Sequence, residues 1–111
     1  MTNIFVTCGA GASSTFLALK LRNLSKHLND DLVFHPVALE TMRPKRNDII
    51  VAASHVSTES ILEDYEQSGV TVLRLPISPI NDELASNALE LIEKVLVGEP
   101  NENHTTQRSN N

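Results

Sequence analysis

The feature that most constrains the fold is a set of four short runs rich in β-branched and other apolar residues. They cover residues 4–7, 32–37, 48–53 and 70–75. Each run has the length of a strand, and its near-continuous apolar pattern is typical of strands that are covered on both faces. The sequence therefore predicts an α/β domain in which helices pack on both faces of one parallel sheet.

Helical patterns separate these runs. Leucines at helical spacing predict a first helix over residues 14–28. A second helix is expected to follow the third strand, with Ser57 or Thr58 as its cap and Gly69 as its stop. These two helices would cover the sheet from either side.

The clearest helix signals lie near the end of the chain. A third helix is predicted to start at Asn81 or Asp82 and to stop at Gly98. Residues 38–47 are too short for a covering helix and are expected to cross as a loop or one helical turn. Residues 98–111 are polar, have no apolar side chain except Pro100 and are predicted to form a disordered tail.

Chain length and charge narrow the function. With 111 residues the chain has the size of one domain, which we place at residues 1–97. Its 14 Asp and Glu outnumber 9 Lys and Arg, so the formal net charge is −5 with neutral His. This charge disfavours binding to nucleic acid or to an anionic membrane surface. No signal peptide or membrane-spanning segment is recognisable, and we expect a cytoplasmic protein.

Residues that could bind a metal or a cofactor are sparse. A single cysteine excludes an intramolecular disulfide and a Cys-rich zinc site, and the four histidines are not clustered at ligand spacing. Three Phe, one Tyr and no Trp leave no aromatic platform for stacking a base or a flavin. We predict neither a metal site nor a cofactor.

The single cysteine, Cys8, ends the first predicted strand and precedes a run of small residues. Ligands of parallel α/β sheets bind at this edge, beyond the carboxyl ends of the strands. A loop of small residues that opens a helix can turn its N–H groups toward an anion, and Gly9 and Gly11 can adopt positive φ there. The same N–H groups favour a thiolate, so we expect a lowered pKa for the Cys8 thiol. An anion-binding loop beside a nucleophile indicates a covalent phosphocysteine.

Each of these features also has a purely structural interpretation. A lone cysteine at the end of a buried strand commonly acts as a small hydrophobic residue, and the chain would then be a non-catalytic anion-binding or regulatory module. A cysteine phosphatase is a weaker alternative, because it needs an Arg six residues after the Cys and Ser14 stands there. The P-loop lysine motif and the third glycine of the dinucleotide fingerprint are both missing.

The segment IFVTCGAGASST, residues 4–15, resembles the phosphocysteine loop of the IIB components of the bacterial phosphoenolpyruvate-dependent sugar phosphotransferase system. The lactose/cellobiose family is the best match, and the likeness in strand and helix order covers residues 3–96. The resemblance implies an α/β three-layer sandwich. Its four-stranded parallel sheet would have the order 2-1-3-4, with helices on both faces and a phosphatase-like phosphate loop.

The resemblance also implies a function and partners. A phosphohistidine IIA protein would phosphorylate Cys8, and the phosphoryl group would pass to a sugar bound by the IIC membrane permease. The Cys-Gly-x-Gly-x-x-Ser pattern is also similar to the ascorbate and galactitol branches, which leaves the sugar open. The residues implied to hold the phosphoryl group are Gly9, Ala10, Gly11, Ala12, Ser13, Ser14 and Thr15.

Further candidates lie outside this loop. His55 follows the third strand and is a candidate contact of the phosphoryl group, the alternative being a loop histidine bonded to backbone or water. Asp82 stands where a phosphatase could keep a general acid, but its place before a helix favours a cap or first-turn acid.

The stiff, apolar residues 76–79 are expected to border a partner surface. The basic residues predicted at the opposite edge of the sheet are Arg43, Lys45 and Arg46.

Overall fold

The computed structural model describes residues 2–8, 11–27 and 31–98. A four-stranded, all-parallel sheet has the order β2-β1-β3-β4, and three α-helices pack against it, so the predicted α/β fold and strand order are confirmed. Short 3₁₀ turns, η1, η2 and η3, lie between some of these elements. In chain order the elements are β1 (Thr2–Thr7), α1 (Gly11–Leu24), η1 (Ser25–His27), β2 (Leu32–Pro36), η2 (Leu39–Thr41), β3 (Ile49–Ala52), η3 (Ser54–Thr58), α2 (Ile61–Gln67), β4 (Thr71–Arg74) and α3 (Asp82–Leu96).

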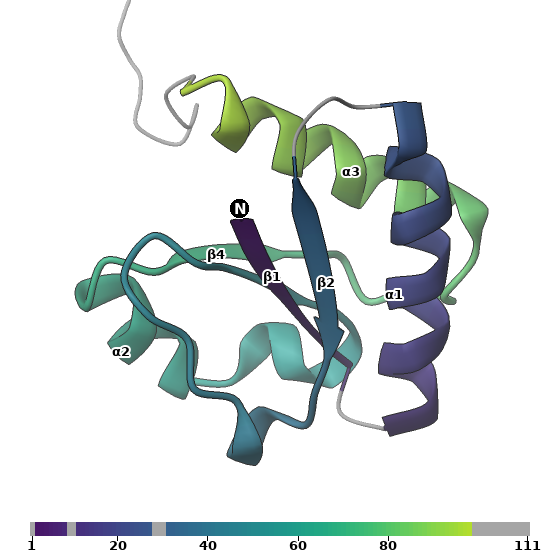
Figure 1. Ribbon diagram of the computed structural model, residues 1–111. Helices are drawn as coiled ribbons and strands as arrows, with labels where there is room; N and C mark the ends of the chain where they lie inside the picture. Colours follow the sequence, from purple (N-terminus) through teal and green to yellow (C-terminus); the bar gives the residue numbers. More distant parts are fainter. Residues whose placement is uncertain (1, 9–10, 28–30, 99–111) are drawn as a thin grey trace, which may run out of the picture.

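The two faces of the sheet are covered by different helices. On one face α1 and α3 lie side by side, and Leu17 and Ile92 pack with Ile4 of β1 in the larger of two apolar clusters. On the other face α2 and the segment around η2 cover the sheet, and Leu62 packs there with Ile50 of β3. Figure 1 shows the resulting three layers, with α1 and α3 on one side of the strands and α2 on the other.

Alternation along β1 explains how one strand serves both layers. Ile4 and Val6 belong to the α1/α3 cluster, whereas Phe5 packs in the cluster on the α2 face. All four residues of β3 are buried, which fits a strand paired on both sides and covered on both faces. Burial on both faces explains why the sequence of β3 is a near-continuous apolar run.

Both ends of α3 follow the predicted signals. Asn81 is the N-cap, and its side-chain oxygen accepts a hydrogen bond from Leu84 N at 2.9 Å. Gly98 follows the helix with φ +77°, the left-handed conformation that ends many helices. This prediction is confirmed.

The other helix starts differ from the sequence prediction. α1 begins at Gly11 rather than Ser14 and ends at Leu24, with the 3₁₀ turn η1 after it. Ser57 and Thr58 do not cap α2 but lie in the 3₁₀ turn η3, and α2 starts at Ile61 without a side-chain cap. The Ser57 and Thr58 hydroxyls instead donate to carbonyls within η3.

The remaining connections agree with the prediction. Residues 38–47 contain the single 3₁₀ turn η2 and no covering helix. Gly69 ends α2 with φ +96°, a left-handed conformation that favours glycine, and the neighbouring Arg46 side chain lies where a Cβ would point. Lys45 N donates to Asp48 Oδ2 at 2.8 Å just before β3, which places the exposed basic residues at the amino edge as predicted.

No helix in the described part of the chain is long and apolar enough to cross a membrane. The tail predicted to be disordered lies, after Gly98, outside the described residues.

Candidate functional site

The candidate site lies where the chain leaves β1. From β1 the chain passes through α1 to β2, which pairs with one edge of β1. From β2 it then returns past β1 to β3, which pairs with the opposite edge of β1. The strand order therefore reverses around β1, and parallel α/β sheets bind ligands at such switch points. Backbone hydrogen bonds hold the ends of the three strands together: Val37 N donates to Val6 O, and Ala53 N donates to Thr7 O, each at 3.0 Å.

Cys8 occupies this position, directly after Thr7, the last residue of β1. Its residue surface is only 4% exposed, and it packs in the α1/α3 cluster with Leu17. The sequence placed the thiol at the mouth of a loop, whereas the structure places it against the apolar layer. The thiol is thus at the edge where ligands bind but sheltered from solvent.

Ser14 lies in the first turn of α1 and turns back toward Cys8. It is 1% exposed, and its Oγ accepts a hydrogen bond from the Cys8 backbone N–H at 3.0 Å. This bond connects the end of the strand to the start of the helix across six residues. The side chain that occupies the position of the phosphatase Arg therefore contacts the cysteine itself.

The predicted lowering of the Cys8 pKa is wrong for the protein in this conformation. Burial raises the pKa of the Cys8 thiol above its ordinary value, because the apolar surroundings disfavour the charged thiolate. A side-chain hydrogen bond from Ser14 lowers the pKa but is the smaller of the two influences. The lowered pKa was expected from the helix N-terminus alone, because the sequence does not show how deeply Cys8 is buried.

The predicted phosphate loop is described only in part. Gly9 and Ala10 lie outside the described residues, and of Gly11, Ala12 and Ser13 the structure describes the backbone, which forms the first turn of α1. Gly11 is therefore helical, and the positive φ expected for it is not found. Thr15 is exposed on the same helix. The first N–H groups of a helix have no partner within it, so this turn remains suited to an anion.

The loop after β3 reaches the same edge. Ser54 has φ +58°, a left-handed conformation that is uncommon for a residue with a side chain. His55 follows it in η3, and its side chain is exposed. Ser57 is 7% exposed, and its Oγ donates to Ser54 O at 2.9 Å, which holds this turn together. The structure brings His55 to the carboxyl edge but gives it no bond to Cys8 among the described interactions.

One polar residue at this edge was missed from the sequence. Thr7 is fully buried, and its Oγ1 has no hydrogen-bond partner among the described residues. Strand alternation directs this side chain to the face opposite Val6, toward the α2 layer. The available signal was a hydroxyl residue at the end of an otherwise apolar strand.

Asp82 behaves as the helix interpretation predicted. It lies in the first turn of α3 and forms an ion pair with Lys20 of α1. The Lys20 ammonium also lies 4.7 Å from the centre of the Phe16 ring. The ion pair links α1 to α3 on the surface, and Asp82 shows no sign of being a general acid.

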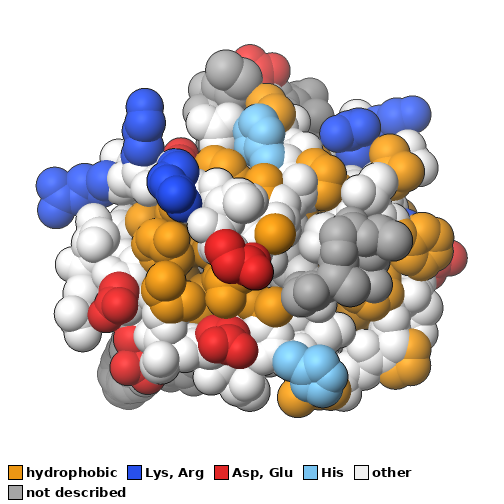
Figure 2. All heavy atoms as spheres, turned by 90° about the horizontal axis from the view of Figure 1, so that it is seen from below, with side chains coloured by type: hydrophobic (Ala, Val, Ile, Leu, Met, Phe, Trp, Pro, Cys, Tyr) orange, Lys and Arg blue, Asp and Glu red, His pale blue; other side chains and the backbone are white. Residues whose placement is uncertain are grey.

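Figure 2 views the molecule from the side toward which β1 and β2 run. Hydrophobic side chains are spread across this face, and Lys and Arg side chains gather toward its upper left and upper right. Ile77, in the segment expected to border a partner surface, is 62% exposed, and Phe16 on α1 is 49% exposed. The described part of the face is thus more apolar than basic around its centre.

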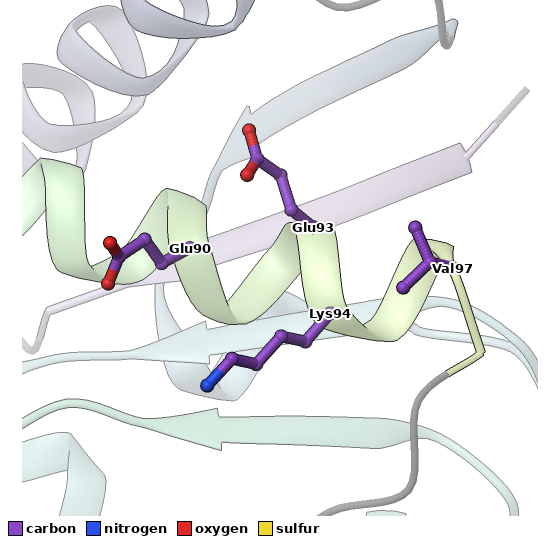
Figure 3. Close-up of a pocket in the computed structure, with 4 residues that line it drawn as sticks. All are labelled: Glu90, Glu93, Lys94 and Val97. Atoms are coloured by element: carbon purple, nitrogen blue, oxygen red, sulfur yellow. The ribbon is translucent and has the colours of Figure 1, made fainter.

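The hollow drawn in Figure 3 lies elsewhere. It has a volume of about 370 Å³ and is lined by Glu90, Glu93 and Lys94 on the last turns of α3 and by Val97 directly after it. These side chains project from the outer surface of the helix, at its far end from Asp82. The hollow is therefore separate from the Cys8 edge.

Comparison with known proteins found no matching family model, no similar curated protein and no similar solved structure.

Proposed function

We propose that this protein is a phosphocarrier of a sugar phosphotransferase system, a IIB component of the lactose/cellobiose type. The observation that carries the proposal is the position of Cys8, the chain's only thiol, at the end of β1 and directly before the region that opens α1. It combines a nucleophile, a switch point and a helix N-terminus at one place. The resemblance of residues 4–15 to the phosphocysteine loop supports the same assignment.

The proposed reaction has two transfers. In the first, the Cys8 thiolate attacks the phosphorus of a phosphohistidine on the IIA partner; the S–P bond forms, the N–P bond breaks, and its electron pair stays on the imidazole nitrogen. In the second, a hydroxyl oxygen of the sugar held by the IIC permease attacks the phosphorus, and the S–P electron pair returns to sulfur. The hydroxyl proton leaves to a base or to solvent. The backbone of residues 9–15 would hold the phosphoryl oxygens between the two transfers.

A carrier is favoured over a phosphatase by the surroundings of Cys8. The position of the phosphatase Arg is taken by Ser14, a neutral side chain turned toward Cys8 itself. Arg74, at the carboxyl end of β4, is held by Glu66 through both terminal nitrogens, at 2.6 and 3.1 Å. A site without an Arg clamp stabilises the transition state of hydrolysis less, and the phosphoryl group persists long enough to be passed on.

The proposal implies where the protein works and with what. It acts at the cytoplasmic side of a membrane permease, receives phosphoryl groups from a IIA protein and needs neither metal nor cofactor. Phe16, near the start of α1, and Ile77, in the segment after β4, are exposed and suit contact with these partners. The sugar is selected by the permease, and cellobiose, lactose, chitobiose and ascorbate- or galactitol-type substrates all remain candidates.

The experiment is direct phosphorylation. The protein is incubated with phosphorylated IIA donors of the lactose/cellobiose, ascorbate and galactitol types, and the label is located by peptide mapping. We expect one thiophosphate on Cys8 and none in Cys8→Ser. Label on another residue, or no label from any donor, contradicts the proposal.

A second candidate function follows from the burial of Cys8. With Cys8 only 4% exposed and the pKa of its thiol raised, the chain fits a non-catalytic anion-binding or regulatory module in which Cys8 only lines the site. Binding of inorganic phosphate or sulfate without any transfer to Cys8 would support this module. Hydrolysis of an aryl phosphate would instead support the phosphatase.

A further inference from the structure

The Cys8 thiol is subject to two opposing influences, and only one comes from a polar group. Burial disfavours the thiolate, and the hydrogen bond from Ser14 favours it. Among the described residues no charged side chain contributes to the shift. A bond that lowers a thiol pKa must donate to sulfur, because only a donor stabilises the negative charge. Ser14 is therefore the described polar group that assists ionisation of Cys8.

The same hydroxyl also fixes the backbone of Cys8. Its oxygen accepts the Cys8 N–H at 3.0 Å, and both residues are almost fully buried. One hydroxyl thus accepts a hydrogen bond from the main chain of Cys8 and, through a side-chain hydrogen bond, lowers the pKa of its thiol, from a position in the first turn of α1. Neither contact would survive replacement of Ser14 by Ala.

We propose that Ser14 is a positioning residue for Cys8: its hydroxyl joins the end of β1 to α1 and stabilises the sulfur whenever it carries negative charge. In the phosphocarrier proposed above, on which this second part rests, the charge appears twice in each cycle. Sulfur is a thiolate when it attacks the phosphohistidine and again when the S–P bond breaks toward the sugar. Ser14 therefore assists both transfers.

Alkylation of Cys8 by iodoacetamide as a function of pH tests the inference without any phosphoryl donor. The midpoint of the rate profile is the readout, because substitution can also change access to the buried thiol. Ser14→Ala is expected to move the midpoint upward, so that at neutral pH the rate, relative to its limiting value at high pH, falls about tenfold. Ser14→Thr retains the hydroxyl and is expected to restore the midpoint.

Ser57→Ala is the matched control. Ser57 is also a buried serine at the carboxyl edge, but its hydroxyl donates to Ser54 O and does not contribute to the pKa shift of Cys8. Its loss should leave the midpoint where it is in the unmodified chain. Should Ser14→Ala fail to fold, amide hydrogen exchange of the unmodified chain replaces it: the Cys8 N–H must be protected by its bond to Ser14, and rapid exchange overturns the inference.

The outcomes separate this inference from the proposed function. A midpoint in Ser14→Ala equal to that of Ser57→Ala overturns the role of Ser14, even if Cys8 accepts phosphate from a IIA donor. A shifted midpoint in a protein that accepts no phosphate supports the role of Ser14 in ionisation and contradicts the phosphocarrier. A shifted midpoint restored by Ser14→Thr, together with slower phosphorylation in Ser14→Ala, supports both.

Discussion

Two of the segments that leave the sheet at its carboxyl edge, the start of α1 after β1 and the turn η3 after β3, contain a buried serine each. After β1, Ser14 bonds back to Cys8 across six residues, whereas after β3, Ser57 bonds to Ser54 within a single 3₁₀ turn. The two serines are similarly buried, with 1% and 7% of the residue surface exposed, but their hydroxyls have different hydrogen-bond partners. One meets the only thiol of the chain and the other meets a carbonyl. The comparison teaches that a buried hydroxyl can serve structure alone. Whether it also affects reactivity depends on the group to which it is hydrogen-bonded.

The largest effect separates the loops by activity. Cys8→Ser is expected to lower phosphorylation by a IIA donor by roughly 10³-fold or more, because the hydroxyl is a far weaker nucleophile than the thiolate. Ser57→Ala should leave phosphorylation close to that of the unmodified chain. The measurement is the initial rate of labelling, with circular dichroism to show that both variants fold. Equal rates in the two variants would remove the distinction between the loops.

The next effect concerns pH. Because the folded pKa of Cys8 is raised, the unfolded chain loses its thiol proton first as pH increases. The free energy of unfolding is then unaffected by Cys8 below the ordinary thiol pKa, and it falls between that value and the raised one. The slope is at most about 1.4 kcal/mol per pH unit. Urea titrations of the unmodified chain and of Cys8→Ser should diverge only in this alkaline range, and parallel curves would show that the thiol is not buried in solution.

A third effect measures the structural role of the second loop. Ser57→Ala removes the donor to Ser54 O and is expected to lower the free energy of unfolding by about 1–2 kcal/mol. Urea denaturation provides the value. If the loss were negligible, the hydrogen bond within η3 would contribute no stability, and the contrast with Ser14 would rest on activity alone.

The smallest effect involves the hydroxyl that has no partner. Thr7→Val keeps the shape of the side chain and removes a buried oxygen without a hydrogen bond among the described residues. It is expected to raise the free energy of unfolding by about 1 kcal/mol or less, since nothing described is lost. A clear destabilisation would reveal that Thr7 Oγ1 has a hydrogen-bond partner in solution, as Ser14 Oγ does.

The sequence predicted the sheet well because strand burial is encoded locally. The fully buried β3 appears as an uninterrupted apolar run, and the N-cap Asn81 and the stop at Gly98 are set by neighbouring residues. The cap of α2 was misplaced because Ser57 could equally well close a 3₁₀ turn, and both uses require the same residue type. Local patterns of hydroxyl residues do not distinguish the two.

The properties of the site were harder to predict because they depend on packing. Nothing in residues 8–15 reveals that Cys8 is buried in the same apolar cluster as Leu17, and this burial reverses the expected direction of its pKa. The role of Ser14 was hidden for the same reason. As a residue of a small-residue loop it was expected to face an anion, and only the first turn of α1 brings its hydroxyl onto Cys8.

The position of β1 also bears on how the chain is made. The strand is first in the sequence yet central in the sheet, and it pairs with residues 32–36 and 49–52. A newly synthesised β1 has neither neighbour, and parallel partners so distant in sequence form their contacts slowly. During that interval Cys8 is open to oxidants and electrophiles, and its full burial is reached only when the apolar cluster that contains it, with residues of α1, β3 and α3, has assembled.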